Sequence, residues 1–137
     1  MKAILSTAAA LIALSGTAVF AEGDAAAGEK DFRKCKSCHA ITSPEGESIV
    51  KGGKTGPNLY GVIGRQVAAE DFKYGDSIAA LGETGEVWTE ETLVVYIADP
   101  KGFLIEKTGD DAAKSKMTFK LKDGADVAAY LATFSAQ

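Results

Sequence analysis

The residues best suited to chemistry are two cysteines and a histidine in the run Cys35-Lys36-Ser37-Cys38-His39. Two thiols at positions i and i+3, followed at once by an imidazole, form the attachment signature of a c-type haem. Each thiol can add to one haem vinyl group as a thioether, and the adjacent imidazole is then placed to bind the iron. Because the motif occurs once in the 137 residues, we expect one covalently attached haem c, with His39 as an iron ligand.

Three other interpretations of this motif compete with haem attachment. A redox-active pair of cysteines usually lies beside a βαβ pattern, and no such pattern follows here. A structural zinc site requires four ligands, almost always Cys and His, whereas the chain has two Cys and one His in total. A structural disulfide at this spacing is sterically poor inside a helical turn. These observations favour haem.

A haem iron held by one histidine takes a second axial ligand or keeps an open position. After residue 21 the chain has no further His, no spare Cys and a single methionine, Met117. Methionine and histidine are the axial ligands of electron-transfer cytochromes c. A lone methionine can also fill a core, but the flanking residues 115–119 are polar and basic. We therefore predict Met117 as the second ligand, which Lys114 or Lys116 could displace at high pH.

The first 21 residues have the features of a secretory signal peptide. A basic start at Lys2 precedes an apolar stretch that includes Ala8 to Leu14, and residues 19–21 place small side chains where a signal peptidase requires them. The alternative is a retained membrane anchor, which needs about 20 predominantly apolar residues. We expect residues 1–21 to be removed by cleavage after Ala21, which leaves residues 22–137 as one exported domain.

Acidic residues outnumber basic ones, 19 against 15, so the formal net charge is −4. This balance argues against nucleic-acid binding, which depends on a basic surface. The lysines are unevenly placed, however, because four of them lie between residues 114 and 122 with no acidic residue among them. An ordinary solvated stretch would explain such a run, but its position beside Met117 favours a docking patch.

Hydrophobic spacing predicts short helices at both ends of this domain. Asp24 is suited to cap a helix that runs towards the haem motif. Gly28 inside that helix is unfavourable unless another helix crosses closely there, and Tyr130 is the residue we expect to pack against it. The last helix is expected to begin near Asp123, since apolar residues recur at helical spacing over residues 127–134.

Two further helices are expected between these. One begins after Thr89 and is ended by Pro100, because the residue before a proline leaves the helical region. A shorter helix covers residues 75–81. Residues 40–64 are expected to be mostly loop, and few strand signals appear anywhere. The predicted fold class is therefore all-α.

The order and spacing of these segments resemble class I c-type cytochromes, most specifically the cytochrome c2 / cytochrome c550 group of alphaproteobacteria. The resemblance covers Glu22 to Gln137 and implies a cytochrome c fold, with about five short helices and long loops wrapped around one covalent haem. Its markers are Gly28 and Phe32, CKSCH at 35–39, KTGPNLYGVIGR at 54–65, WTEETL at 88–93, KMTF at 116–119 and AAYL at 128–131.

The resemblance also implies roles around the haem. The backbone carbonyl of Pro57 is expected to accept a hydrogen bond from Nδ1–H of His39, which fixes the tautomer of the ligand. Donors to the haem propionates are expected to be Arg65, Tyr74 and Trp88. An ionised propionate in a pocket of low dielectric constant needs such donors.

On the other side of the haem, the resemblance implies that Tyr96 donates to the methionine sulfur and that Phe119 lies beside the exposed haem edge. The chain departs from the mitochondrial pattern in longer loops at residues 41–53 and 100–117. In the helix after residue 74, an asparagine often found in the family is replaced, and the sequence there reads Ser77-Ile78. An inner hydrogen-bond network is therefore expected to differ.

The function implied is that of a soluble, monomeric one-electron carrier of the periplasm, not an enzyme. Its implied partners are the cytochrome bc1 complex as donor and a photosynthetic reaction centre or terminal cytochrome oxidase as acceptor, in photosynthesis or respiration. Such encounters are steered by charge and use small, transient interfaces. The lysines expected to dock are Lys34, Lys54, Lys101, Lys114, Lys116, Lys120 and Lys122. The alternative is a peroxidase-like haem enzyme or a gas-binding haem protein, which would require a labile Met117.

Overall fold

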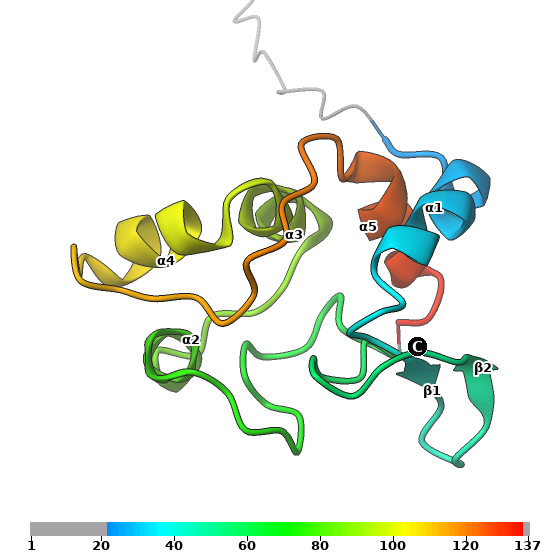
Figure 1. The fold of residues 1–137 in the computed structure, drawn as a ribbon, viewed down its shortest axis with the longest axis horizontal. Coiled ribbons are helices and arrows are strands. Elements are labelled where there is room, and N and C mark those ends of the chain that lie inside the picture. The colour runs from blue at the N-terminus through cyan, green and yellow to red at the C-terminus, as the bar shows by residue number, and fades with distance from the viewer. Residues whose placement is uncertain (1–21, 136–137) are drawn as a thin grey trace, which may run out of the picture.

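The computed structural model describes residues 22–135, so the predicted signal peptide 1–21 and its cleavage lie outside the described residues. Its elements, in order, are α1 (Ala25–Asp31), the 3-10 helix η1 (Phe32–Lys34), β1 (Ile41–Thr42), β2 (Ser48–Val50), α2 (Asp76–Glu83), α3 (Glu90–Ala98), α4 (Pro100–Thr108) and α5 (Ala125–Ala132). Over this part of the chain there are five short α-helices, and most of the connections between them are long loops (Figure 1), which confirms the all-α class. None of the described helices is long and apolar enough to cross a membrane.

Helices α1 and α5 cross where Gly28 lets two backbones meet. A Cβ atom at Gly28 would overlap the backbone carbonyl of Asp126 and would lie 2.8 Å from Cβ of Tyr130. The ring of Tyr130 packs on the buried Phe32, with centroids 5.7 Å apart. The contact predicted between Gly28 and Tyr130 is therefore confirmed, and it joins the two ends of the domain.

Helices α3 and α4 are separated by a single residue, Asp99. Thr89 begins α3 with a capping box, in which its Oγ1 accepts from the N–H of Thr92 at 3.1 Å and the Oγ1 of Thr92 accepts from the N–H of Thr89 at 2.9 Å. Pro100 follows α3, as predicted, but it also opens α4 at a position where a missing N–H costs nothing. The expectation of a loop over residues 100–117 was wrong for its first half, because a proline that stops one helix can start the next.

Strands β1 and β2 form a small antiparallel hairpin in a region expected to be loop. Ile41 pairs with Val50, and Thr42 pairs with Ser48. Strands of two and three residues are too short to show an alternating pattern, which is why the sequence did not reveal them. Ile41 is fully buried, so the hairpin is attached to the core through β1.

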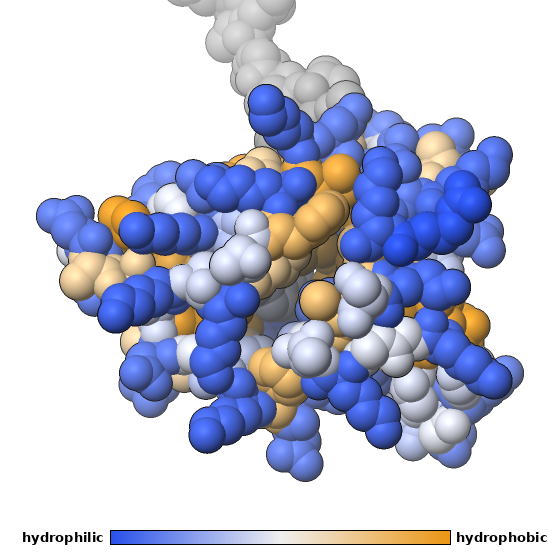
Figure 2. Space-filling model, viewed as in Figure 1, coloured by the Kyte–Doolittle hydropathy of each residue, from blue (hydrophilic) through white to orange (hydrophobic). Residues whose placement is uncertain are grey.

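Two clusters of aromatic rings flank the interior. One lies at α1 and α5 and consists of Phe32, Tyr60, Tyr130 and Phe134. The other joins α3 and α4 and consists of Trp88, Tyr96 and Phe103. Within the fold the chain surrounds a cavity of about 290 Å³. Figure 2 shows this face of the molecule hollowed near its centre, with apolar side chains around the opening.

Substituting Gly28 with alanine is expected to destabilise the fold. The added methyl group meets a backbone carbonyl, which cannot rotate away as a side chain would, so α1 and α5 must move apart. Overpacking of this kind costs about 1–3 kcal/mol and exceeds the gain in helix propensity, about 1 kcal/mol. Guanidinium unfolding of the holo-protein should show the loss, whereas Lys30→Ala on the exposed side of α1 should shift the midpoint little. An unchanged midpoint for Gly28→Ala would contradict the close crossing.

Candidate haem-binding site

A single cavity brings together every side chain that the sequence assigned to haem binding. Residues from the haem motif, the loop after it, α3 and the connection between α4 and α5 all contribute to its wall. The predicted site residues among them are Cys35, Cys38, His39, Pro57, Arg65, Tyr74, Trp88, Tyr96 and Met117, together with Phe119.

The CxxCH segment forms a turn directly after η1. The backbone N–H groups of Cys38 and His39 both donate to the carbonyl of Cys35, at 3.1 and 3.0 Å. Burial raises the pKa of the Cys35 thiol to about 11. The Cys38 thiol is exposed, and hydrogen bonds from Thr55 and Ser37 lower its pKa. The two thiols therefore line one cavity but differ in acidity, and Cys38 is the more readily ionised.

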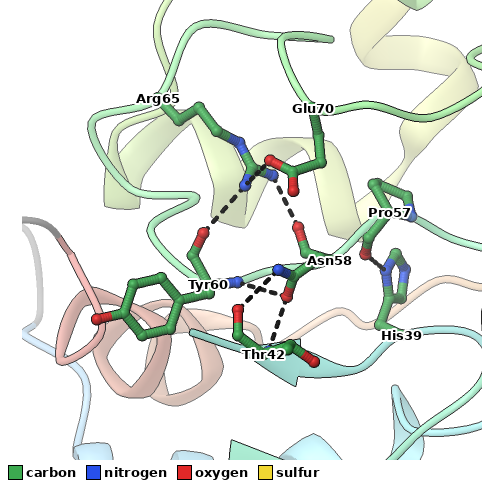
Figure 3. A network of polar contacts seen from close by, with 7 residues as sticks. All are labelled: His39, Thr42, Pro57, Asn58, Tyr60, Arg65 and Glu70. Carbon is green, nitrogen blue, oxygen red and sulfur yellow. Dashed lines mark hydrogen bonds and ion pairs between the residues drawn. The ribbon is translucent and has the colours of Figure 1, made fainter. Parts of the chain in front are cut away.

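His39 is held in a defined tautomer. Its Nδ1 lies 2.8 Å from the backbone oxygen of Pro57 (Figure 3), and a carbonyl oxygen can only accept, so Nδ1 carries the proton. The lone pair of Nε2 is thereby left for a metal ion. Burial lowers the pKa of the imidazole, and the bond to Pro57 acts in the opposite direction. The hydrogen bond that the resemblance implied is present.

Gly56 leaves room for this imidazole. A Cβ atom at that position would lie 2.6 Å from Nδ1 and 2.8 Å from Nε2 of His39, closer than any side chain tolerates. A glycine directly before Pro57 is therefore required by the ring itself. The sequence marked the Gly-Pro pair as part of a motif, but the steric reason for the glycine appears only in the structure.

The guanidinium of Arg65 is held by three acceptors (Figure 3). Its Nη1 donates to the carbonyl of Tyr60 at 3.0 Å and to the carboxylate of Glu70 at 3.1 Å, and its Nη2 donates to the carbonyl of Asn58 at 3.0 Å. A guanidinium has five N–H donors, so two remain for an acceptor in the cavity. Arg65 is thus fixed in place and still able to bind an anionic group.

Asn58 received no role from the sequence, yet its side chain makes three hydrogen bonds. Its Oδ1 accepts from the N–H groups of Thr42 and Tyr60, at 3.0 and 3.1 Å, and its Nδ2 donates to the carbonyl of Thr42 at 2.8 Å. These bonds tie β1 to the peptide unit that follows Pro57 (Figure 3). Asn58 therefore steadies the carbonyl that orients His39.

Tyr74, Trp88 and Tyr96 also line the cavity. Trp88 and Tyr96 are buried, and their ring centroids lie 5.0 Å apart, so both serve as core in addition to any polar role. Burial raises the pKa of Tyr74 and of Tyr96, and both phenols therefore keep their protons at neutral pH. A hydrogen bond with the Ser115 side chain opposes the shift at Tyr96. Donation from Tyr96 to the sulfur of Met117 stays a prediction.

Met117 lies on the connection 109–124 between α4 and α5. It is half-buried and contributes to the cavity wall. Ser115 Oγ donates to the carbonyl of Met117 at 2.8 Å, and the N–H of Leu121 donates to the carbonyl of Ile97 at 2.8 Å. The fold thus brings the two predicted iron ligands, which are far apart in the chain, to one cavity.

The seven lysines predicted to dock do not present their amines equally. Lys116 Nζ donates to the backbone carbonyls of residues 73 and 74, at 3.1 and 3.4 Å. Lys34 and Lys120 each pair with a carboxylate, at 3.0 and 2.9 Å. Within residues 22–135, no ion pair or side-chain hydrogen bond engages the amines of Lys54, Lys101, Lys114 and Lys122.

The donor set and the largely apolar lining of the cavity fit an apolar cofactor with anionic groups. Two thiols lie in its wall, a neutral imidazole offers Nε2, and a guanidinium has N–H groups to spare. Among the described residues, no group of three or more His, Cys, Asp or Glu side chains is placed to hold a metal ion by itself. Much of the remaining wall consists of buried aliphatic side chains, namely Val62, Leu93, Ile97, Leu104, Val127 and Leu131.

Comparison with known proteins gives a consistent result, although no family model matches the chain. The chain is 56% identical to cytochrome c-550 of Paracoccus versutus, over 98% of this chain and 90% of that protein. It is 57% identical to cytochrome c2 of Rhodobacter capsulatus, over 93% of this chain and 94% of that protein.

Solved structures agree with these relatives. The X-ray structure of ferric cytochrome c-550 from Paracoccus versutus matches with a TM-score of 0.81 at 60% identity, over 84% of this chain and all of that one. Cytochrome c2 from Rhodobacter capsulatus matches with a TM-score of 0.80 at 59% identity, over 81% of this chain and 97% of that one. The sequence, the fold and these likenesses together show that the chain belongs to the cytochrome c2 and cytochrome c-550 family of class I c-type cytochromes.

Proposed function

We propose that this chain is a one-electron carrier with one covalently attached haem c. The observation that carries the proposal is that Cys35, Cys38, His39 and Met117 line the same largely apolar cavity. When bound, the haem supplies an iron that accepts and releases one electron. The two thiols would hold it as thioethers, while Nε2 of His39 and the sulfur of Met117 would bind the iron. With both ligands bound, no site on the metal would be left for a substrate.

The residues around the cavity orient and tune that cofactor. The carbonyl of Pro57 keeps His39 in the Nδ1–H tautomer and raises its basicity as a ligand. Arg65, Tyr74 and Trp88 supply donors for the propionates, whose charge would be costly to bury without them. The neutral thioether favours the ferrous state, so the reduction potential should be positive, as for other cytochromes with methionine and histidine ligands.

We further propose that the carrier works in the periplasm after removal of residues 1–21. Its proposed donor is the cytochrome bc1 complex, and its acceptor is a photosynthetic reaction centre or a terminal oxidase. The support is the close likeness to proteins named cytochrome c2 and cytochrome c-550, and a basic segment next to Met117. Phe119 in that segment is exposed while also bordering the cavity, which suits an electron-transfer contact.

Replacing Met117 tests the proposal that both His39 and Met117 bind the haem iron and leave it no open position. The oxidised wild-type protein should show the weak long-wavelength absorption band of a methionine–iron bond, and the reduced protein should not bind carbon monoxide promptly at neutral pH. Met117→Ala should abolish the band, open the iron to carbon monoxide and lower the reduction potential, because a neutral soft ligand is lost. Thr118→Ala, one position away, should keep all three properties of the wild type.

Prompt binding of carbon monoxide by the wild-type protein would decide against the carrier. It would show that Met117 is absent from the iron or leaves it easily. The alternative, a peroxidase-like enzyme or a gas-binding haem protein, would then be the better description.

Neutralising lysines tests the docking face. Lys101→Gln combined with Lys114→Gln removes two amines that have no described partner, and should slow association with isolated cytochrome bc1 complex about three- to tenfold at low ionic strength. The difference should shrink as salt is added, because charge steering is screened. The matched control, Lys30→Gln with Lys51→Gln, makes the same change in net charge at two lysines outside the set predicted to dock. Equal slowing by both pairs would show that net charge, and not this patch, governs the encounter.

A further inference from the structure

The segment that carries Met117 is tied to helix α2 by one side chain. The backbone N–H of Lys114 donates to Oγ of Ser77 at 2.9 Å, although the two residues are 37 positions apart. Ser77 stands in the first turn of α2 and is half-buried. A serine near a helix start often caps its own helix, but here Gly75 is the cap residue and the hydroxyl accepts from another segment instead.

This bond is one of two backbone tethers that bracket Met117. Among the described hydrogen bonds of the backbone N–H groups from 114 to 121, only those of Lys114 and Leu121 reach an acceptor elsewhere in the fold. Leu121 donates to the carbonyl of Ile97 at the end of α3. Residues 115–120 are therefore held at one end by α2 and at the other by α3, with Met117 between the two tethers.

We propose that Ser77 is a positioning residue for Met117, because its Oγ fixes Lys114 and so keeps the methionine at the cavity. The inference rests on the proposed function, in which the sulfur of Met117 binds the iron. The side chains of Lys116 and Lys120 also bind elsewhere in the fold, but only two backbone tethers hold the segment. A segment that loses one of its two backbone tethers opens locally more often, even where the rest of the fold is unchanged. The N–H of Lys114 lies in an exposed residue, so water replaces the hydroxyl when it is removed, and the fold as a whole loses little.

The test uses the full holo-protein and imidazole as an external ligand for the ferric iron. Imidazole can bind only when Met117 has left, so its apparent affinity reports the open fraction. Ser77→Ala should raise that affinity about two- to tenfold, the range expected for one hydrogen bond, and should speed amide exchange at Lys114 by a similar factor. Ser77→Thr keeps the hydroxyl oxygen and should behave as the wild type.

A second serine provides a matched control. Oγ of Ser43 accepts from the N–H of Glu47 at 3.2 Å, in the connection between β1 and β2, so Ser43→Ala deletes the same kind of bond outside the Met117 segment. It should leave both the imidazole affinity and the exchange at Lys114 unchanged. An equal rise in Ser43→Ala or Ser77→Thr would overturn the positioning role, because the effect would then be a general loosening.

The two hypotheses fail in different ways. If the wild-type protein lacks the methionine–iron band, Met117 is not the ligand, and the role of Ser77 falls with the proposed function. If the band is present but Ser77→Ala changes neither imidazole affinity nor amide exchange, the carrier stands and the positioning role is overturned.

Discussion

None of these helices can bury its apolar face alone, so each must pack against other parts of the fold. The five helices have seven to nine residues each, and isolated helices below about 12–15 residues are marginal in water. Each therefore depends on tertiary packing. Helix pairs that pack directly include α1 with α5, which cross at Gly28, and α3 with α4, which an aromatic cluster joins. Part of the remaining apolar surface lines the cavity, so side chains such as Val62 and Leu104 belong to the core and to the site at once.

The polar side of the site depends on a very short piece of backbone. The carbonyl of Pro57 orients His39, and the carbonyl of the next residue, Asn58, accepts from Arg65. Because the side chain of Asn58 is bound to β1, the small hairpin has a structural purpose that its size would not suggest. One segment thus positions both the imidazole proposed to bind the iron and the guanidinium proposed to bind a propionate. A change at Asn58 should disturb both together.

The sequence predicted the parts of this molecule that depend on local spacing. The helix that starts after Thr89 and the last helix follow from periodic apolar residues. Gly28 was informative because a glycine inside a helix is unfavourable, which indicated a close helix crossing at that position. Helix α4 was missed because Pro100 signals both an end and a beginning. Asn58 and Ser77 could not be assigned, since each acts through a hydrogen bond to a partner 16 or 37 positions away. Such long-range hydrogen bonds produce no periodic pattern of residues from which they could be predicted.

The lysines show what the structure adds to a count of charges. All seven add positive charge to a protein that is acidic overall, and charge of this kind can steer the encounter with an acidic partner. Short-range pairing with a partner is a separate matter, because it requires an amine that is free to move. Lys34 and Lys120 already face carboxylates, in exposed pairs that are weak, and Lys116 is fixed on backbone carbonyls. Among residues 22–135 no carboxylate pairs with Lys116, so its amine adds to the positive charge there, while its position serves the Met117 segment rather than a partner.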